Sequence, residues 1–468
     1  MNFADMPMQI VRALRQRGYT AEHVQYSSGG GHKFGYHLDN EINVRDHASR
    51  AYAHGSALRR YVEADFDVFH FWNKSFFFTA DYTRLTGLDL PLLKARGKKI
   101  VHRFSGFDLR LRRWDLERNP HSPFRHGYSF EADERLQMAF IDLLRDYADQ
   151  LLVQDPELGQ FLPEARIIPR ALDLRRWPFV GVAPTARPLV IHAPSNPAVK
   201  GTAYVLKAVE ALRDEGLAFD FQLVHGMSHD EARAWLRRAD IVVDQLLIGA
   251  TGVVTLEAWA LGKPVVLYLR EDLFGPFYGT SELPVANANP DTIETVLRRL
   301  IKDHDWRQHL ALAGRRTVET HHDIDKVIEQ FIELYETLHR TPPRPPAGTA
   351  DITYLVLQAE AAAAPSWALQ KVEKLLVNSR LLGPDWVATS WTVDADVPQR
   401  VQLLQAELRR QLQGLRRDAR ITARPGKSAL PVAARPAGRT TRPKPTGWRR
   451  IRKRLKKALA GWLGRRPR

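Results

Sequence analysis

Three short loops in the middle of the chain combine glycine, serine and threonine with a single lysine. They read SNPAVKGT, HGMSH and LLIGATG, and each leads into a segment with helical spacing. Backbone N–H groups at a helix N-terminus attract anions, and a nearby ammonium group adds to that attraction. The loops therefore predict a phosphate site. Its candidate residues are Ser195, Lys200, Gly201, Gly226, Gly252 and Val253.

Two acidic residues lie close to these loops in the sequence. Glu257 stands between Leu256 and Ala258 and is followed by Trp259, so its helix is predicted to be buried. A carboxylate in that position can accept two charge-assisted hydrogen bonds from neighbouring hydroxyl groups. Asp244 ends an apolar run, where it either contacts the ligand or pairs with a local group.

The elements that position these residues are short apolar runs alternating with helical segments. The helical segments start near Ala203, His229 and Thr251, and Thr251 is the expected N-cap of the last one. Such alternation is typical of a parallel sheet with crossover helices. Ligands bind beyond the carboxyl ends of the strands in these sheets. The predicted strands are Leu189–His192, Phe219–Val224, Ile241–Asp244 and Pro264–Leu269.

The same region resembles a known family. The motifs KGT-x-x-V-L-x-A-V, ADIVVDQLLIG and G-V-x-x-L-E-A-x-A-L-G-K-P-V are similar to the nucleotide-sugar half of GT-B glycosyltransferases, especially the retaining group called glycosyl transferases family 1/4-like. The resemblance extends more weakly over residues 1–340. It implies an α/β fold of two Rossmann-like domains facing across a cleft. It also implies transfer from a nucleotide-diphosphate sugar, a retaining outcome, and no metal or other cofactor.

The resemblance assigns roles to several of these residues. Lys200 is expected to stabilise the negative charge that grows on the departing diphosphate, an effect worth roughly 10²–10³ in rate at comparable sites. The N–H groups of Gly252 and Val253 are expected to contact the diphosphate, and Glu257 to accept hydrogen bonds from the ribose. A solvated lysine and a surface glutamate are the competing predictions. Asp244 and Gln245 are placed to touch the donor.

Two positions depart from the pattern of the family. Gly249 stands eight residues before Glu257, where the family often carries a second glutamate near the transferred sugar. The arginine that the family carries shortly before Lys200 has no plain equivalent either. These departures leave sugar recognition and catalysis open, so an inactive binding or scaffold subunit is the alternative. The residues in place of that arginine are His192, Ser195 and Asn196.

The N-terminal region predicts a second Rossmann-like domain on the acceptor side. The stretch VHRFSGFDLR resembles the acceptor loop of the family. His102 and Asp108 are then candidates to orient the acceptor hydroxyl or take its proton, and Arg110 to hold an anionic group. For His102 and His70, packing in the core is the competing prediction. The predicted strands are His23–Tyr26, Asp67–Phe71, Lys99–Arg103, Gln150–Val153 and Arg166–Ile168, and the helices are Pro7–Arg17, Val44–Val62 and Glu131–Tyr147.

Domain boundaries follow from composition. ARIIPRALDLRRWPF resembles the exit from the first domain of the family, and the four prolines of TPPRPPAG end the second domain. Met1 leads almost directly into a helix, so either the strand arrangement differs or the first strand lies upstream. The second is favoured because losing a central strand leaves a ladder unpaired. The predicted regions are 1–177 and 188–340 for the two domains, 350–420 for a helical extension, 421–447 for a disordered linker and 448–464 for an amphipathic helix.

The excess positive charge belongs to the C-terminal tail. Residues 416–468 hold 19 Lys and Arg and one acidic residue, a net charge of +18, against +16 for the whole chain. The apolar residues between Trp448 and Leu463 recur with helical spacing opposite a basic face. Such a helix fits the surface of an anionic membrane. A nucleic-acid-binding arm is disfavoured, because it needs no regular apolar face.

Absent residue types narrow the function further. The chain has no cysteine, which excludes disulfides and thiol chemistry, and it shows no metal-ligand spacing. No apolar run approaches the roughly 20 residues of a membrane span, and no signal-peptide pattern is present. The sequence predicts a cytoplasmic, peripheral glycosyltransferase acting on a glycan or lipid-linked acceptor in cell-surface polysaccharide synthesis. The alternatives are a scaffold subunit and a protein that binds anionic polymers through its tail.

Overall fold

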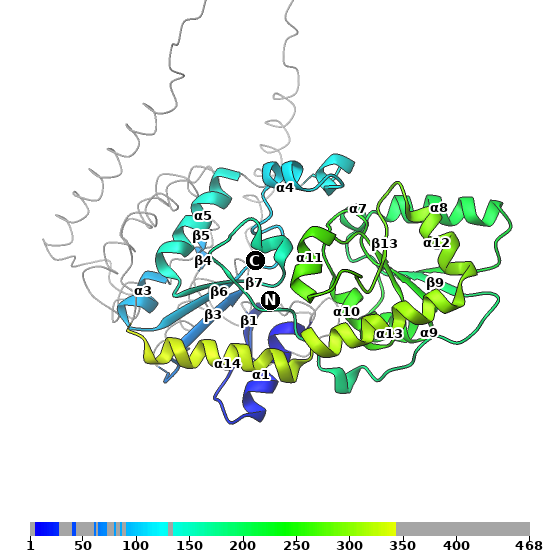
Figure 1. Ribbon diagram of the computed structural model, residues 1–468. Coiled ribbons are helices and arrows are strands. Elements are labelled where there is room, and N and C mark those ends of the chain that lie inside the picture. The colour runs from blue at the N-terminus through cyan, green and yellow to red at the C-terminus, as the bar shows by residue number, and fades with distance from the viewer. Residues whose placement is uncertain are drawn as a thin grey trace, which may run out of the picture. The chain divides into compact units, whose positions relative to one another are not determined.

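The computed structural model describes residues 5–27, 40–43, 60–61, 64–72, 79–80, 85–86, 90–129 and 134–342. Within these residues the two larger sheets, of five and four strands, are parallel, and each is flanked by helices (Figure 1). This is the mixed α/β architecture with two Rossmann-like sheets that the sequence predicted. The regions predicted over 350–420, 421–447 and 448–464 lie outside the described residues, and so does nearly all of the helix predicted over 44–62.

The second domain is built on a five-stranded parallel sheet in the order β10-β9-β11-β12-β13. Residues of β11 and β12 are buried at every position, as expected for parallel strands covered on both faces. The four strands predicted from apolar runs are all present, each within two residues at either end. The strands are β9 (Leu189–His192), β10 (Asp220–Leu223), β11 (Ile241–Val243), β12 (Val265–Leu267) and β13 (Ala286–Asn287).

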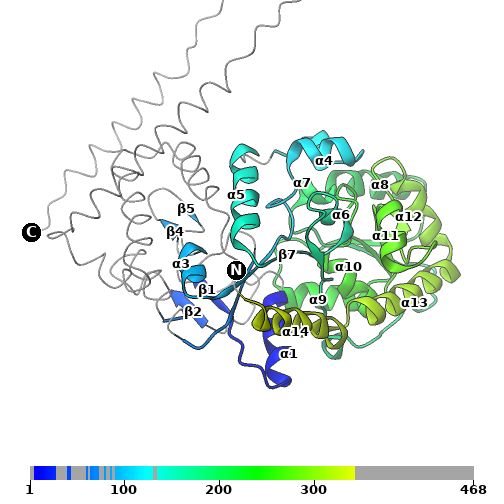
Figure 2. The same ribbon diagram turned by 60° about the vertical axis from the view of Figure 1, so that its left-hand side comes forward.

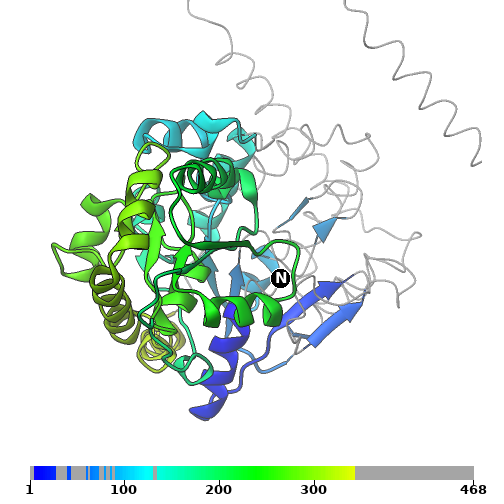
Figure 3. The same ribbon diagram turned by 90° about the vertical axis from the view of Figure 1, so that its right-hand side faces the viewer.

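Helices pack on both faces of this sheet, and Figure 3 turns the domain toward the viewer. Val190 shares one core with Val205 and Leu297, and Ile191 shares the opposite core with Trp259. Neighbouring residues of β9 thus face opposite layers, as the pleat requires. The helices are α7 (Pro197–Lys200), α8 (Thr202–Asp214), α9 (His229–Arg238), α10 (Val253–Ala260), α11 (Glu271–Tyr278), α12 (Ile293–Lys302) and α13 (His304–His321).

The first domain contains a four-stranded parallel sheet in the order β3-β6-β7-β8. Phe69 and Ile100 pack with Phe140 on one face, and Trp72 and Val101 pack on the other. The strands are β3 (Val68–Trp72), β6 (Lys99–Arg103), β7 (Gln150–Val153) and β8 (Arg166–Ile167). The helices are α1 (Met6–Gln16), α3 (Leu90–Ala95), α4 (Arg112–Arg118), α5 (Glu134–Tyr147) and α6 (Pro156–Gly159), with short 3₁₀ helices η3 (Pro123–His126) and η4 (Leu174–Arg176).

Two further strand pairs lie in the first domain. β1 (Val24–Ser27) pairs in parallel with β2 (Asn40–Asn43), and β4 (Thr79–Ala80) pairs antiparallel with β5 (Leu85–Thr86). In the described part of the chain neither pair joins the four-stranded sheet. The first strand expected upstream of the chain stays a prediction.

The last described helix, α14 (Ile324–Arg340), packs on the first domain. It lies beside α1 in both Figure 1 and Figure 2, and Arg17 Nε donates a hydrogen bond to Glu329 Oε1 over 2.7 Å. A parallel β-bridge between Leu172 and Asp323 lies where the chain returns from the second domain to the first. The boundary predicted at residue 340 therefore falls after a helix that belongs, by its packing, to the first domain.

Candidate functional site

The loop after β9 places Lys200 at the carboxyl edge of the second sheet. Asn196 starts α7, because its side-chain oxygen accepts the N–H groups of Ala198 and Val199. Lys200 ends this helix and is buried. Gly201 follows with a φ of 75°, which favours glycine, and a Cβ there would lie 3.2 Å from Leu246 Cβ. The turn that aims Lys200 inward thus depends on the glycine after it.

Lys200 forms an ion pair with Asp244, the residue that follows β11. The second oxygen of Asp244 accepts a hydrogen bond from Thr255 Oγ1 over 2.5 Å. Burial alone would raise the pKa of Asp244, but the Lys200 charge and these hydrogen bonds lower it. Of the two alternatives left open for Asp244, the structure shows local pairing.

Gly252 lies directly against this ion pair. A Cβ added at Gly252 would lie 2.5 Å from Asp244 Oδ2 and 3.0 Å from Lys200 Nζ. Because 2.5 Å is far inside van der Waals contact, only glycine fits between the pair and the start of α10. Gly252 is the N-cap of α10, so the first N–H groups of the helix open beside Lys200. An ammonium group and a helix N-terminus thus meet at one point.

Thr251 does not cap α10 as predicted. Gly252 occupies the N-cap, and its N–H donates to Thr255 Oγ1 over 3.3 Å. Thr251 is buried and hydrogen bonded to Tyr278, whose pKa is raised mainly by burial. Thr255, inside the helix, therefore satisfies the N–H of the N-cap residue, and among the described residues no side chain caps the first turn of α10.

Glu257 is buried on α10 and contacts His229, the first residue of α9. Its Oε1 lies 3.0 Å from His229 Nε2. This hydrogen bond raises the pKa of His229, although burial opposes it. Ser228 and Glu231 form a capping box that fixes the start of α9 at His229. His229 was not among the residues predicted from the sequence; the signal for it was a histidine directly after a capping serine in the HGMSH loop.

The other candidates of the second domain have different surroundings. Ser195 and Gly226 are exposed on their loops, and Gly226 has a φ of 73° with nothing within 4 Å of a Cβ. His192 is fully buried, with Nδ1 2.9 Å from Val243 O and Nε2 2.8 Å from Thr202 Oγ1. Burial lowers the pKa of His192 to about 4, so the ring is neutral and links two strand ends.

Gly249 is closed to any side chain. Its φ is 78°, and a Cβ would lie 2.7 Å from Arg270 Cγ and 3.1 Å from Tyr268 Cε1. Arg270 N also donates to Gly249 O over 3.1 Å. The glutamate that the resemblance placed here is therefore incompatible with the backbone of this loop, and not merely absent.

The acceptor-side candidates lie in packed surroundings. His102 is fully buried on β6, with its ring 4.5 Å from the ring of Phe104 and 5.7 Å from that of Phe140. Asp108 accepts the N–H groups of Ser105 (3.1 Å) and Gly106 (2.7 Å), which closes its own loop. Burial raises the pKa of Asp108 despite these bonds. These surroundings favour structural roles, and the catalytic role of both residues stays a prediction.

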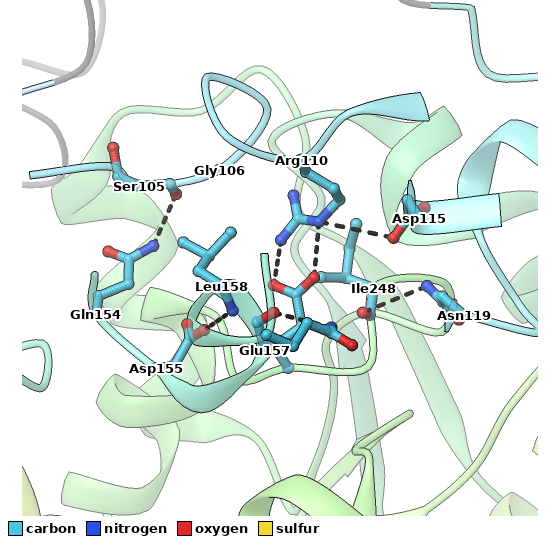
Figure 4. Close-up of polar contacts among 12 residues, drawn as sticks. Ser105, Gly106, Arg110, Asp115, Asn119, Gln154, Asp155, Glu157, Leu158 and Ile248 are labelled. Atoms are coloured by element: carbon cyan, nitrogen blue, oxygen red, sulfur yellow. Dashed lines mark hydrogen bonds and ion pairs between the residues drawn. The ribbon is translucent and has the colours of Figure 1, made fainter. Parts of the chain in front are cut away.

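Arg110 is held by carboxylates of its own domain (Figure 4). Its Nε and Nη2 donate to the two oxygens of Glu157 over 2.9 and 2.5 Å. The Glu157 charge raises the pKa of Arg110 even though the site is buried. His70 Nδ1 lies 2.7 Å from the hydroxyl of Tyr335 on α14, and burial lowers the pKa of His70. The core role weighed for His70 matches this position.

In the described part of the chain no group of three His, Asp or Glu side chains is arranged to hold a metal ion. None of the helices in that part is both long and apolar enough to cross a membrane.

Comparison with known proteins points to one family. A family model described as glycosyl transferase-like matches residues 207–333, which confirms the resemblance over most of the second domain. No curated protein sequence matches the chain.

Solved structures similar to this chain are distant in sequence. Sucrose-phosphate synthase from Thermosynechococcus elongatus is 15% identical with a TM-score of 0.49, over 71% of this chain and 92% of its own. HepE from Anabaena, in complex with UDP-glucose, is 11% identical with a TM-score of 0.45, over 71% and 96%. WaaG, a glycosyltransferase involved in lipopolysaccharide biosynthesis, is 13% identical with a TM-score of 0.42, over 70% and 94%.

Proposed function

We propose that this protein is a glycosyltransferase whose second domain binds the diphosphate and ribose of a nucleotide-activated sugar. The observation that carries the proposal is the meeting of Lys200 with the N-terminus of α10, which also bears Glu257. The glycosyl transferase-like match includes Gly252 and Glu257. An anion and a pair of vicinal hydroxyls are the two groups that these residues suit.

Lys200 can serve a diphosphate while it remains paired with Asp244. Transfer breaks the bond between the anomeric carbon and a diphosphate oxygen, and the bonding electrons leave with the diphosphate. An ammonium group has three N–H donors, and Asp244 Oδ1 takes one of them. The two others and the first N–H groups of α10 are then available to phosphate oxygens. In a site from which water is excluded, this stabilisation favours the transition state.

Glu257 suits the ribose of the nucleotide. An ionised carboxylate offers about four acceptor positions, and His229 takes one on Oε1. The remaining positions can accept both ribose hydroxyls. The helix around Glu257 is buried from Thr255 to Ala260, and Glu257 itself is 6% exposed.

Direct binding tests this part of the proposal. Calorimetric titration with UDP, GDP, UDP-glucose and GDP-mannose should show binding of at least one nucleotide by the wild-type protein. Glu257→Ala should weaken that affinity roughly 10- to 100-fold, because hydrogen bonds to a charged group are lost. Glu210→Ala, an exposed acid on α8, is the matched control. Equal nucleotide affinity of wild type and Glu257→Ala would refute the assignment.

The rest of the reaction is proposed on the sequence alone. The donor sugar passes to a glycan or lipid-linked acceptor, with retention at the anomeric carbon and without a metal. The basic helix predicted from Trp448 to Leu463 holds the enzyme on an anionic membrane. Flotation with phosphatidylglycerol-containing vesicles should recover the full chain but not a chain ending at Gly447. Recovery of both, or of neither, would contradict the membrane role.

A second function, a binding subunit without turnover, is favoured by two observations. Asp244 already neutralises Lys200, and Gly249 excludes the acidic side chain that the resemblance led us to expect. This reading predicts nucleotide-sugar binding with neither hydrolysis nor transfer. Incubation of the full chain with a nucleotide sugar that binds, followed by measurement of released nucleotide, separates the two functions.

A further inference from the structure

The first domain reaches the phosphate loop of the second domain through Asn119. Asn119 Nδ2 donates to Leu247 O over 2.8 Å and lies 3.4 Å from Ile248 O. These carbonyls belong to the loop between Asp244 and Gly252, the two ends of the proposed phosphate site. A group attached to a diphosphate bound at this loop would therefore face the segment that carries Asn119.

This segment, residues 111–128, contacts the second domain at two further points. Arg270 Nη1, after β12, donates to Arg118 O over 2.8 Å. His126 Nδ1 lies 2.7 Å from the hydroxyl of Tyr204, in the first turn of α8. The segment thus contacts the loops that follow β11 and β12 and the start of α8, so it is placed to contribute side chains to a ligand bound there.

Asp115, in the first turn of α4 and four residues before Asn119, has one oxygen without a hydrogen-bond partner. Only 1% of Asp115 is exposed. Its Oδ2 accepts a hydrogen bond from Ser122 Oγ, whereas its Oδ1 accepts none. A buried acceptor left unsatisfied costs roughly 1–3 kcal/mol, and more when it is charged. Such an atom in a native structure points to a partner that arrives with the ligand.

The surroundings of Asp115 indicate the kind of ligand. The nearest cation is Arg110, whose Nε lies 3.9 Å from Asp115 Oδ1, and both donors that face Glu157 are taken by that carboxylate (Figure 4). One guanidinium therefore serves two buried carboxylates, and Arg270 adds a more distant positive charge. A carboxylate oxygen can only accept a hydrogen bond, so Asp115 Oδ1 suits a hydroxyl donor and not a phosphate oxygen.

The second domain offers no side chain for the same task at Gly249. The backbone there has a φ of 78°, and the Arg270 side chain occupies the space of a Cβ. Hydroxyl recognition at this point of the loop has to come from the facing segment. Asp115 is the acidic residue of that segment whose carboxylate is both buried and incompletely hydrogen bonded.

We propose that Asp115 Oδ1 accepts a hydrogen bond from a hydroxyl of the transferred sugar, so that the first domain determines which sugar is accepted. This inference rests on the proposed function. It makes Asp115 a specificity-determining residue for the donor sugar, while Lys200 and Glu257 hold the nucleotide. The sugar portion of the donor thus depends on one domain and the nucleotide portion on the other.

The test compares a nucleotide with its own nucleotide sugar. Dissociation constants of the full chain are measured by calorimetry for UDP against UDP-glucose and for GDP against GDP-mannose. Asp115→Ala should weaken binding of the nucleotide sugar roughly 10- to 100-fold. Binding of the bare nucleotide should change less than about twofold. Asp115→Asn, which keeps the shape of the side chain but not its charge, should lie between wild type and Asp115→Ala, and it gives the readout if the alanine variant does not fold.

Two controls separate recognition from structure. Ser122→Ala removes the partner of Asp115 Oδ2 and should lower Tm without changing the ratio of the two dissociation constants. Asp142→Asn, an exposed carboxylate on α5, should change neither. Unchanged nucleotide-sugar affinity in both Asp115 variants, or an equal loss for nucleotide and nucleotide sugar, would overturn the inference. If the wild-type protein binds no nucleotide at all, the proposed function fails first, and the inference fails with it.

Discussion

The two domains differ in what became of the residues singled out for chemistry. In the second domain Lys200, Asp244 and Gly252 lie in direct contact at the carboxyl edge of one sheet. In the first domain His102 is enclosed by aromatic rings and Asp108 is used by its own loop. Both sets of residues lie in or after the strands of a parallel sheet. What differs is the burial and prior engagement of each side chain.

The contrast shows that a position near a strand end places a residue at the edge of the sheet but does not determine where its side chain points. Successive residues of a strand point to opposite faces, and helices cover both faces of these sheets, so a residue within a strand enters a core and a residue beyond its end can face a ligand. His102 lies within β6, whereas Asp244 follows the end of β11. Lys200 reaches its edge only because Asn196 and Gly201 bound a single helical turn.

Removal of the Lys200 side chain should cause the largest loss of stability and turnover. A small loss would contradict the difference between the two domains. Lys200→Ala leaves Asp244 buried and unpaired, which should destabilise the fold by roughly 3–5 kcal/mol. Turnover per folded molecule should fall roughly 10²–10³-fold. Urea unfolding and donor hydrolysis measure the two effects. Lys207→Ala, an exposed lysine on α8, is the control; a Lys200 variant as stable and active as this control would remove the case for the site.

His102 tests the other half of the comparison. His102→Ala should lose roughly 2–5 kcal/mol of unfolding free energy, because it opens a cavity beside Phe104 and Phe140. His102→Phe, which restores apolar volume, should recover part of that loss and turn over nearly as fast as wild type. Loss of turnover in both variants at normal stability would show that His102 is catalytic. Each domain would then contribute a functional residue.

His192 sharpens the comparison, because it is a structural histidine inside the better site. Its pKa of about 4 in the folded state lies below the ordinary value of 6.5, so the unfolded chain takes up the proton first. Stability should therefore fall by roughly 3 kcal/mol as the pH drops from 6.5 to 4. The buried His322, with a pKa of about 3, adds a loss in the same direction.

Urea unfolding across this pH range measures the effect. His192→Asn should flatten the curve, although His322 keeps part of the slope. His309→Asn, at an exposed position on α13, is the matched control. A His192→Asn curve as steep as that of wild type would mean that His192 titrates normally in the folded protein.

Asp108 should give the smallest effect. Asp108→Ala removes the acceptor of the Ser105 and Gly106 N–H groups and should cost about 1 kcal/mol for each hydrogen bond lost. Nucleotide affinity should stay within about twofold of wild type. Thermal unfolding and calorimetry check both values, and a large loss of turnover at unchanged Tm would restore the acceptor-binding prediction.

Sequence patterns predicted the second domain better than the first for a physical reason. β9, β11 and β12 are largely covered on both faces, so each reads as a continuous apolar run with glycine-rich turns after it. The site residues adjoin those runs and could be picked out by type. His229 and Asp115 lie 28 and 142 residues before Glu257, and no local pattern joins them to the site.

Long-range packing decided the remaining features. The return of α14 to the first sheet depends on Phe331 and Arg17 meeting partners more than 200 residues away. For Asp244 the sequence left ligand contact and local pairing open, and the fold pairs it with Lys200. From the sequence, Gly249 differs from the family only by lacking a glutamate. The position of Arg270 in the structure shows that no side chain fits there.

The sequence by itself determined the α/β class, the second sheet and its glycine-bounded loops, because hydrophobic periodicity and backbone freedom are local properties. The tertiary structure decided which polar groups are already paired and which keep an open acceptor. That distinction depends on burial and on contacts between distant segments, as Asp244 and Asp115 show. Both are buried aspartates, and only the fold gives one a lysine and leaves the other with an open oxygen.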